Sequence, residues 1–191
     1  MPEFTRAFIA IELNESLHSE FASLQSVLKK SNADVKWVAP DSIHLTLKFL
    51  GNINTQKIKD IEKVLNKTAA EVEPFVLTFK GIGAFPDPDY PRVVWVGIES
   101  GAVQSKQLAK VIEDELEKIG IPRENREFQA HITLGRVKSL KNNDILKEII
   151  VATKFAAGSA VDVNHLTLFK SQLSREGPVY APLFIAKMKN A

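Results

Sequence analysis

The sequence predicts an α+β fold of two pseudo-symmetric lobes, each a small, mainly antiparallel sheet with helices on its outer side. Strand-like and helix-like patterns are interspersed along the whole chain of 191 residues. The pattern His-apolar-Thr-Leu occurs at His44 and again at His131, about half a chain apart, and a predicted helix follows each copy. A chain of this length suits one compact domain, so we expect residues 1–191 to form a single bilobed domain with one motif in each lobe.

The first half of the chain is predicted to begin with a strand and then to alternate with helices. Asn14 is a suitable N-cap for the first helix, whose apolar residues recur at helical spacing. The predicted elements in order are a strand at 4–13, a helix at 14–31, two strands around the turn Pro40-Asp41-Ser42 within 35–53, and a helix at 54–72.

The second half is predicted to contain a hairpin, two helices and three further strands. Gly120 suits the C-terminal end of the first of these helices, and Asn143 or Asp144 could cap the second. The predicted elements are strands at 75–85 and 92–100 around the loop 86–91, a helix at 103–121, a strand at 128–137, a helix at 142–154, and strands at 160–173 and 179–188 separated by a turn at 174–178.

Composition and charge limit the classes of function. Apolar residues make up 45% of the chain and charged residues 25%, which is ordinary for a globular protein. The chain has no cysteine, which excludes disulfides, cysteine nucleophiles and zinc–thiolate centres. Lys and Arg number 25 against 23 Asp and Glu, too small an excess to identify a nucleic-acid partner. Without a signal-peptide pattern or a membrane-length apolar run, we expect a cytoplasmic protein with no membrane partner.

Both copies of the motif place polar groups on one face of a strand, because successive side chains of a strand point to opposite faces. In "HLTLKFL" the polar face carries His44, Thr46 and Lys48. In "HITLGRV" it carries His131 and Thr133. Two such strands facing each other would enclose a cleft lined by two imidazoles and two hydroxyls.

This set of groups suits in-line displacement at phosphorus. Imidazole titrates near neutral pH, so one histidine can accept a proton from the nucleophile while the other donates one to the leaving oxygen. Threonine hydroxyls can donate hydrogen bonds to the non-bridging phosphate oxygens. The pattern requires no metal and no cofactor. A single His-x-Thr pair on a strand is more often structural, so the prediction rests on the two matching copies.

The same residues resemble a known family, the two-histidine phosphoesterases, and in particular the RNA 2′,3′-cyclic phosphodiesterases, also called the LigT or 2′-5′ RNA ligase family. The resemblance extends over nearly the whole chain. It is carried by the order and spacing of five segments: "RAFIAIEL", "VKWVAPDSIHLTLKFLG", "GIGAFPDPDYPRVVWVGI", "FQAHITLGR" and "LTLFKSQLSREGPVY". One departure is Ala130, where the family often has proline before the second motif.

The resemblance implies a substrate class and residue roles. The implied substrate is RNA, or a nucleotide, that ends in a 2′,3′-cyclic phosphate. Water attacks phosphorus, the bond to the 3′-oxygen breaks, and a 2′-phosphate remains; reversible 2′-5′ ligation of RNA ends is implied as a side activity. The family's roles carry over to His44 as proton donor, His131 as proton acceptor, and Thr46 and Thr133 as phosphate-binding residues. The residues alone leave open which histidine is the acid.

Three further residues are candidate substrate-binding groups. Arg136 follows the second motif and suits phosphate geometry. Strict alternation turns it away from the cleft, where it would form a structural salt bridge, unless a bulge intervenes. Lys48 lies on the polar face of the first motif and would add positive charge there. Tyr180 and Phe49 are candidates for stacking on a terminal base, although Phe49 falls on the core face by alternation.

Other histidines and functions must be weighed against this prediction. "HLTLFK" at His165 is a third, partial copy, which we expect to be a rim or solvent-facing histidine; His18 is expected at the surface and Trp37 in the core. A small cyclic nucleotide or a 2′-5′ oligoadenylate is an alternative substrate, favoured by a closed pocket, whereas RNA needs a basic track. A non-catalytic RNA-end-binding module is another alternative. No obligate protein partner is evident.

Overall fold

The computed structural model describes residues 3–173 and 178–190. The predicted turn at 174–178 therefore lies, apart from Pro178, outside the described residues. The elements in chain order are β1 (Phe4–Glu12), α1 (Glu15–Lys29), β2 (Val35–Trp37), η1 (Pro40–Ser42), β3 (His44–Asn54), η2 (Thr55–Lys57), α2 (Ile58–Ala70), β4 (Phe75–Leu77), β5 (Phe79–Phe85), β6 (Val93–Ile98), α3 (Ala102–Lys118), β7 (His131–Val137), α4 (Asn143–Ala152), β8 (Val161–Val163), β9 (His165–Leu173) and β10 (Pro178–Lys187).

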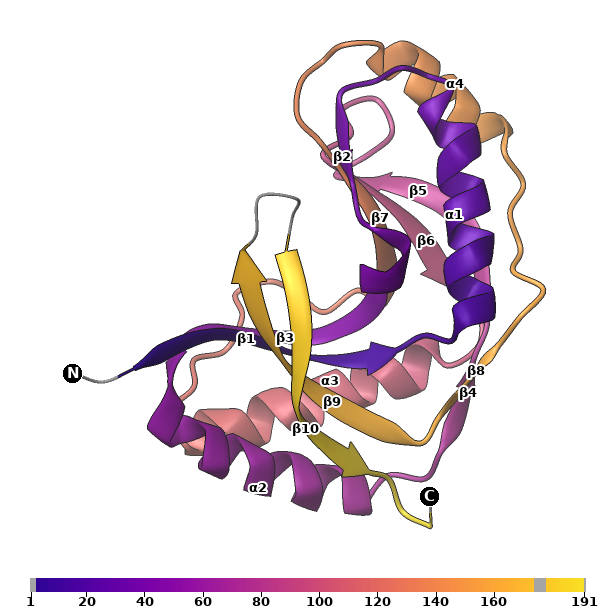
Figure 1. Cartoon of the computed structure of the whole chain (residues 1–191). Coiled ribbons are helices and arrows are strands. Elements are labelled where there is room, and N and C mark those ends of the chain that lie inside the picture. The colour runs from indigo at the N-terminus through magenta and orange to yellow at the C-terminus, as the bar shows by residue number, and fades with distance from the viewer. Residues whose placement is uncertain (1–2, 174–177, 191) are drawn as a thin grey trace.

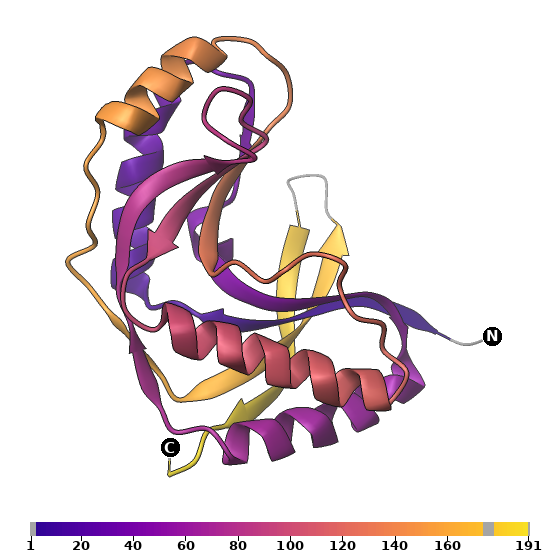
Figure 2. The same cartoon turned by 180° about the vertical axis from the view of Figure 1, so that it is seen from behind.

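The strands form two four-stranded antiparallel sheets, which confirms the predicted α+β class. One sheet has the order β10-β9-β1-β3 and the other β2-β7-β6-β5. Helices α2 and α3 cover the outer side of the first sheet, and α1 and α4 cover the second (Figure 1). The view from behind shows α2 and α3 side by side (Figure 2). The first motif begins β3 and the second begins β7, so each sheet carries one copy.

Neither sheet with its helices is built from one contiguous half of the chain. After β1 the chain crosses to the second sheet, where it forms α1 and β2, and it then returns to the first sheet as β3. The predicted strands at 75–85 and 160–173 are each divided, because their first residues form β4 and β8, which pair with each other in a separate two-stranded sheet. As a result, each four-stranded sheet contains strands from both halves of the chain.

The core lies between each sheet and its helices, as the alternation of the motif strands predicts. Leu45 and Leu47 of β3 and Ile132 and Leu134 of β7 are all buried. The Asn14 side chain caps α1 by accepting a hydrogen bond of 3.0 Å from the Leu17 amide, as predicted. The cap predicted for α4 was wrong. That helix begins at Asn143 after Asn142, and no side-chain hydrogen bond caps it.

Within the described residues, no helix has both the length and the apolar character needed to cross a membrane.

Candidate active site

Each motif strand contains a β-bulge at the leucine that follows the threonine. On β3, Thr46 pairs with Ala10 of β1 and the next paired residue is Lys48, so Leu47 is skipped. On β7 the register with β6 likewise skips Leu134. An extra residue in one strand shifts the alternation of the residues that follow it. The residue after each bulge, Lys48 or Gly135, therefore faces the core. The residue after that, Phe49 or Arg136, faces the cleft.

The bulge on β3 makes two of the sequence predictions wrong. Lys48 is buried with 2% of its surface exposed, and its Nζ lies 2.6 Å from Glu113 Oε1 of α3. The same Nζ donates a hydrogen bond of 2.9 Å to the carbonyl of Pro122. Lys48 is thus a core cation and does not lie in the cleft. Phe49, expected in the core, instead lines the cleft with 51% of its surface exposed.

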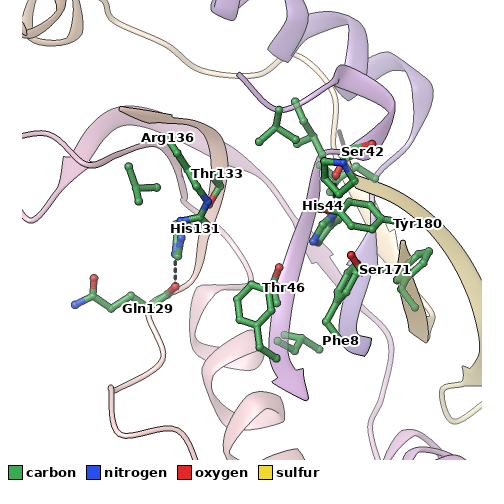
Figure 3. Close-up of a pocket in the computed structure, with 18 of the residues that line it drawn as sticks. Phe8, Ser42, His44, Thr46, Gln129, His131, Thr133, Arg136, Ser171 and Tyr180 are labelled. Atoms are coloured by element: carbon green, nitrogen blue, oxygen red, sulfur yellow. Dashed lines mark hydrogen bonds between the residues drawn. The ribbon is translucent and has the colours of Figure 1, made fainter. Parts of the chain in front are cut away.

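The bulge on β7 turns Arg136 into the cleft, on the same face as His131 (Figure 3). Gln25 of α1, which is buried, supports this geometry: its Nε2 donates to the carbonyl of Leu134 at 2.9 Å and to that of Val38 at 2.8 Å. Gln25 was missed by the sequence analysis. The sequence does contain an indication of this role. Gln25 comes four residues after Phe21, on the apolar face of the helix, where a polar side chain needs a buried hydrogen-bond partner.

Gly135 takes the position on β7 that Lys48 takes on β3. A Cβ atom at this position would lie 2.6 Å from Val35 Cγ1 and 2.9 Å from Cε3 of Trp37. The missing side chain therefore lets β2 pack closely against the bulge. Trp37 packs partly buried against the core, as predicted, and the residue also borders the cleft.

The two motif histidines are held by the same local contact. His44 Nδ1 lies 2.8 Å from the carbonyl oxygen of Ser42, and His131 Nδ1 lies 2.7 Å from that of Gln129. A carbonyl oxygen can only accept, so each Nδ1 carries the proton and donates it. Each Nε2 is then available to accept a proton when the ring is neutral and to donate one when it is charged. Figure 3 shows the two rings on opposite sides of the pocket.

The surroundings of the two rings differ in charge. Burial is the main influence on both histidines and lowers the pKa of each below its usual value. At His44 the hydrogen bond to Ser42 and the negative charge of Glu12 act in the opposite direction. At His131 the hydrogen bond to Gln129 likewise acts upward, but the positive charge of Arg136 adds to the lowering of the pKa. The charged neighbours thus favour the protonated form of His44 and the neutral form of His131.

Aromatic side chains surround His44. Its ring stacks on Phe8 with centroids 4.7 Å apart, and Tyr180 meets it edge-on at 5.3 Å. Phe169 lies behind Phe8 at 5.2 Å, in a stacked arrangement. The sequence analysis identified Tyr180 but missed Phe8 and Phe169, because both sheet faces of β1 and β9 are rich in apolar residues and the pattern does not say which face meets the cleft.

The cleft between the sheets contains both motifs. Its volume is about 2090 Å³, and its lining includes His44, Thr46, His131 and Thr133. Arg136 and Tyr180 also border it. Of the predicted site residues, the structure therefore brings together all except Lys48.

The remaining histidines have defined partners. His18, expected at the surface, is half-buried at the edge of the cleft, with Nε2 3.3 Å from the carbonyl oxygen of Ile43. His165 has 34% of its side chain exposed, consistent with a position at the rim, and its Nε2 lies 3.2 Å from Glu12 Oε2. Among residues 3–173 and 178–190, no group of three or more His, Asp or Glu is placed to hold a metal ion.

Comparison with known proteins identifies the family. The family model for LigT-like phosphoesterases matches the chain twice, over residues 11–95 and 96–180. The chain belongs to the LigT-like phosphoesterase family. The first match contains the motif at His44 and the second contains the motif at His131, together with the partial copy at His165, so the two main motifs correspond to the two copies of the family's repeating unit.

Similar proteins cover nearly the whole length of this LigT-like chain. The chain is 36% identical over 183 residues to the RNA 2′,3′-cyclic phosphodiesterase of Methanothermobacter thermautotrophicus, covering 96% of this chain and 98% of the relative. The crystal structure of TT0787 of Thermus thermophilus superposes with a TM-score of 0.81 at 26% identity, covering 97% of this chain and 100% of the other. E. coli LigT complexed with 3′-AMP superposes with a TM-score of 0.78 at 26% identity, covering 97% and 99%.

Proposed function

We propose that the protein is an RNA 2′,3′-cyclic phosphodiesterase, which opens a terminal cyclic phosphate to a 2′-phosphate by acid/base catalysis with two histidines. The observation that carries the proposal is the pair of imidazoles across one cleft, each with Nδ1 bound to a backbone carbonyl and Nε2 available for proton transfer. The names of the relatives support the substrate class. The single bilobed domain and the cytoplasmic location predicted from the sequence are part of the proposal.

The arrangement supports a specific course for the reaction. His131, whose neutral form the charge of Arg136 favours, accepts a proton from water as the water oxygen attacks phosphorus. The bond from phosphorus to the 3′-oxygen breaks, and His44 donates its proton to that oxygen. Thr46 and Thr133 donate hydrogen bonds to the non-bridging oxygens, where charge accumulates. The product is a 2′-phosphate beside a free 3′-hydroxyl.

The two histidines finish this step in exchanged protonation states, so proton exchange with solvent must restore them before the next turnover. The cleft borders solvent, which permits this exchange. A ribose 5′-hydroxyl in place of water would form a 2′-5′ phosphodiester with the same proton transfers. Reversible ligation therefore needs no additional catalytic residue in this proposal.

The size and charge of the cleft favour RNA over a small nucleotide. Its volume of about 2090 Å³ exceeds the roughly 300–1,000 Å³ typical of small-molecule pockets. One rim is electrically balanced, since Lys106, Lys110 and Arg123 form ion pairs with acidic side chains. On the other rim, Lys36 of β2 is the cross-strand neighbour of Arg136 of β7, and Lys138 comes two residues after Arg136 in the chain.

We call Lys36, Arg136 and Lys138 the basic rim. Among the ion pairs of residues 3–173 and 178–190, none involves a residue of the basic rim. Its charges are therefore available for the phosphates of a single strand. A non-catalytic binder is the weaker alternative, because recognition of phosphate does not require two histidines with matched Nδ1 contacts.

The test is to incubate the protein, with EDTA present, with an RNA oligomer that ends in a 2′,3′-cyclic phosphate, and to map the phosphate on the product. Formation of a 2′-phosphate supports the proposal. Binding of the RNA without turnover would favour the end-binding module. Turnover of a cyclic mononucleotide but not of the oligomer would favour the small-nucleotide alternative.

The pKa directions predict an acidic optimum for kcat/KM. Burial lowers the pKa of both histidines below 6.5, the usual value. Above that pH, His44 has lost the proton that it must donate, and at the acidic end His131 has gained a proton and no longer acts as a base. We expect a bell-shaped profile with its maximum below about pH 6.5, measured with an RNA substrate at constant ionic strength. A profile that keeps rising through pH 8 would contradict this prediction.

The basic rim gives a prediction for Arg136→Gln. We expect the KM for an RNA oligomer to rise, and the dependence of log(1/KM) on log[salt] to become shallower by about 0.7, since one phosphate contact of a single strand is lost. A cyclic mononucleotide should be affected less. The control is Lys110→Gln on the opposite rim, where Asp114 already neutralises the lysine. Equal changes in salt dependence for the two variants would contradict the assignment.

A further inference from the structure

The third copy of the motif lies beside the first in the same sheet. Strand β1 pairs with β3 on one side and with β9 on the other, antiparallel in both cases, so β3 and β9 run in the same direction. Ala10 of β1 is the cross-strand partner of both Thr46 and Thr167. Glu12, also on β1, is the partner of His44 and contacts His165. Glu12 thus stands between the two histidines on one face of the sheet.

The polar groups of the third copy are already engaged with Glu12. Thr167 has no exposed surface, and its hydroxyl donates a hydrogen bond of 2.6 Å to Glu12 Oε2. His165 Nε2 lies 3.2 Å from the same oxygen, and its Nδ1 lies 2.6 Å from Asn164 Oδ1. A hydroxyl that is buried and bound to a carboxylate cannot also bind a phosphate. The third copy therefore holds a carboxylate, whereas the first two copies face the cleft.

We propose that Glu12 is a positioning residue for His44: its carboxylate, held by His165 and Thr167, stabilises the protonated imidazole that donates to the leaving oxygen. This inference rests on the proposed function. Cross-strand partners have Cβ atoms about 4.5–5.5 Å apart, which is close enough for a carboxylate to act on the neighbouring ring. Strand β1 thus supplies a negative charge beside the acid, and β7 supplies the positive charge of Arg136 beside the base.

The charged surroundings of His44 are compatible with this role. The effect of Glu12 on the pKa of His44 is upward and opposes that of burial. The titratable and charged side chains that face this region are Arg6 and Glu12 on β1, His165 on β9, Tyr180 and Lys187 on β10, His18 on α1, Asp41 in η1, and His131 and Arg136 across the cleft on β7. Of the two carboxylates in this set, Glu12 is the cross-strand partner of His44.

The test compares Glu12→Gln, Glu12→Asp and Thr167→Val with the wild type by NMR titration of the histidine rings, together with the pH profile of kcat/KM. Glutamine keeps the shape and one acceptor oxygen but removes the charge. We expect the titration midpoint of His44 to fall by about half a pH unit or more in Glu12→Gln, and the basic limb of the profile to fall with it. His131 serves as the internal control, with an unchanged midpoint. Aspartate should retain part of the effect, and Thr167→Val should give a smaller shift than Glu12→Gln.

Several outcomes would overturn the inference. An unchanged His44 midpoint in Glu12→Gln would do so, as would a loss of activity that is equal at every pH, because a purely structural role predicts that result. If Glu12→Gln does not fold, the same criteria apply to Glu12→Asp and Thr167→Val, whose His44 midpoints must then also fall. Failure of the proposed function is distinguishable: the wild type would not open the cyclic phosphate, while the NMR titration would still report the coupling of Glu12 to His44.

Discussion

Replacement of either motif histidine is expected to reduce kcat for the opening of an RNA 2′,3′-cyclic phosphate by about 10²- to 10⁴-fold. In His44→Ala the leaving 3′-oxygen has no proton donor, and in His131→Ala the attacking water has no base. Because both groups act in one displacement step, the double variant should be little slower than either single variant. The measurement is single-turnover hydrolysis of an RNA oligomer, followed by separation of the 2′-phosphate product.

The histidine variants need controls for folding and for specificity. His44 stacks on Phe8, so His44→Gln, which preserves more of the side-chain volume, should accompany the alanine variant, and circular dichroism should verify the fold. His165→Ala is the comparison within the third motif copy, and we expect its activity to stay within about tenfold of the wild type, since it acts only through Glu12. Retention of more than a tenth of the wild-type rate by a His44 or His131 variant would refute the two-histidine mechanism.

The central residues of the site could be predicted because their signal is local. A strand that alternates His-apolar-Thr-Leu presents the histidine and threonine on one face whatever the rest of the fold does, and the structure places both pairs in the cleft. The resemblance to a family then assigned roles that spacing alone did not. The two basic residues among the further candidates fared differently. Arg136 reached the cleft and Lys48 did not, because Lys48 is the first residue after its bulge and Arg136 is the second.

The error at Lys48 has a physical cause that sequence patterns do not reveal. A β-bulge shifts the alternation by one residue, and nothing in "HLTLKFLG" marks Leu47 as the extra residue. The same shift brought Arg136 into the cleft. The bulges depend on partners that are remote in the chain, such as Gln25, which bonds to the carbonyl of Leu134. Contacts of this kind, like those of Glu12 with β9, become visible only when the strand order is known.

Lys48→Ala is expected to cause a large loss of stability without a comparable loss of catalysis. The substitution removes a buried ammonium group that bonds to Glu113 and to the carbonyl of Pro122, and it leaves the carboxylate, whose side chain is only 18% exposed, without its partner. Breaking a buried pair in this way costs about 3–5 kcal/mol. For a chain of this size the unfolding midpoint should fall by on the order of 10 °C. Thermal unfolding followed by circular dichroism measures this directly.

The same experiment decides between the two interpretations of Lys48. Loss of a substrate-binding lysine raises KM and leaves the unfolding midpoint unchanged, whereas loss of a core lysine lowers the unfolding midpoint and leaves KM unchanged. Lys106→Ala is the matched control, since its ammonium also pairs with a glutamate but is exposed, and such pairs contribute little. Lys48→Met combined with Glu113→Gln removes both charges and should recover much of the stability. If Lys48→Ala instead unfolded at the wild-type temperature and showed a raised KM for RNA, the ammonium would act in the cleft. Because the bulge on β3 turns the Lys48 side chain away from the cleft, we expect the unfolding midpoint of Lys48→Ala to fall. Its KM for RNA, measured at a low temperature where the variant is folded, should stay near the wild-type value.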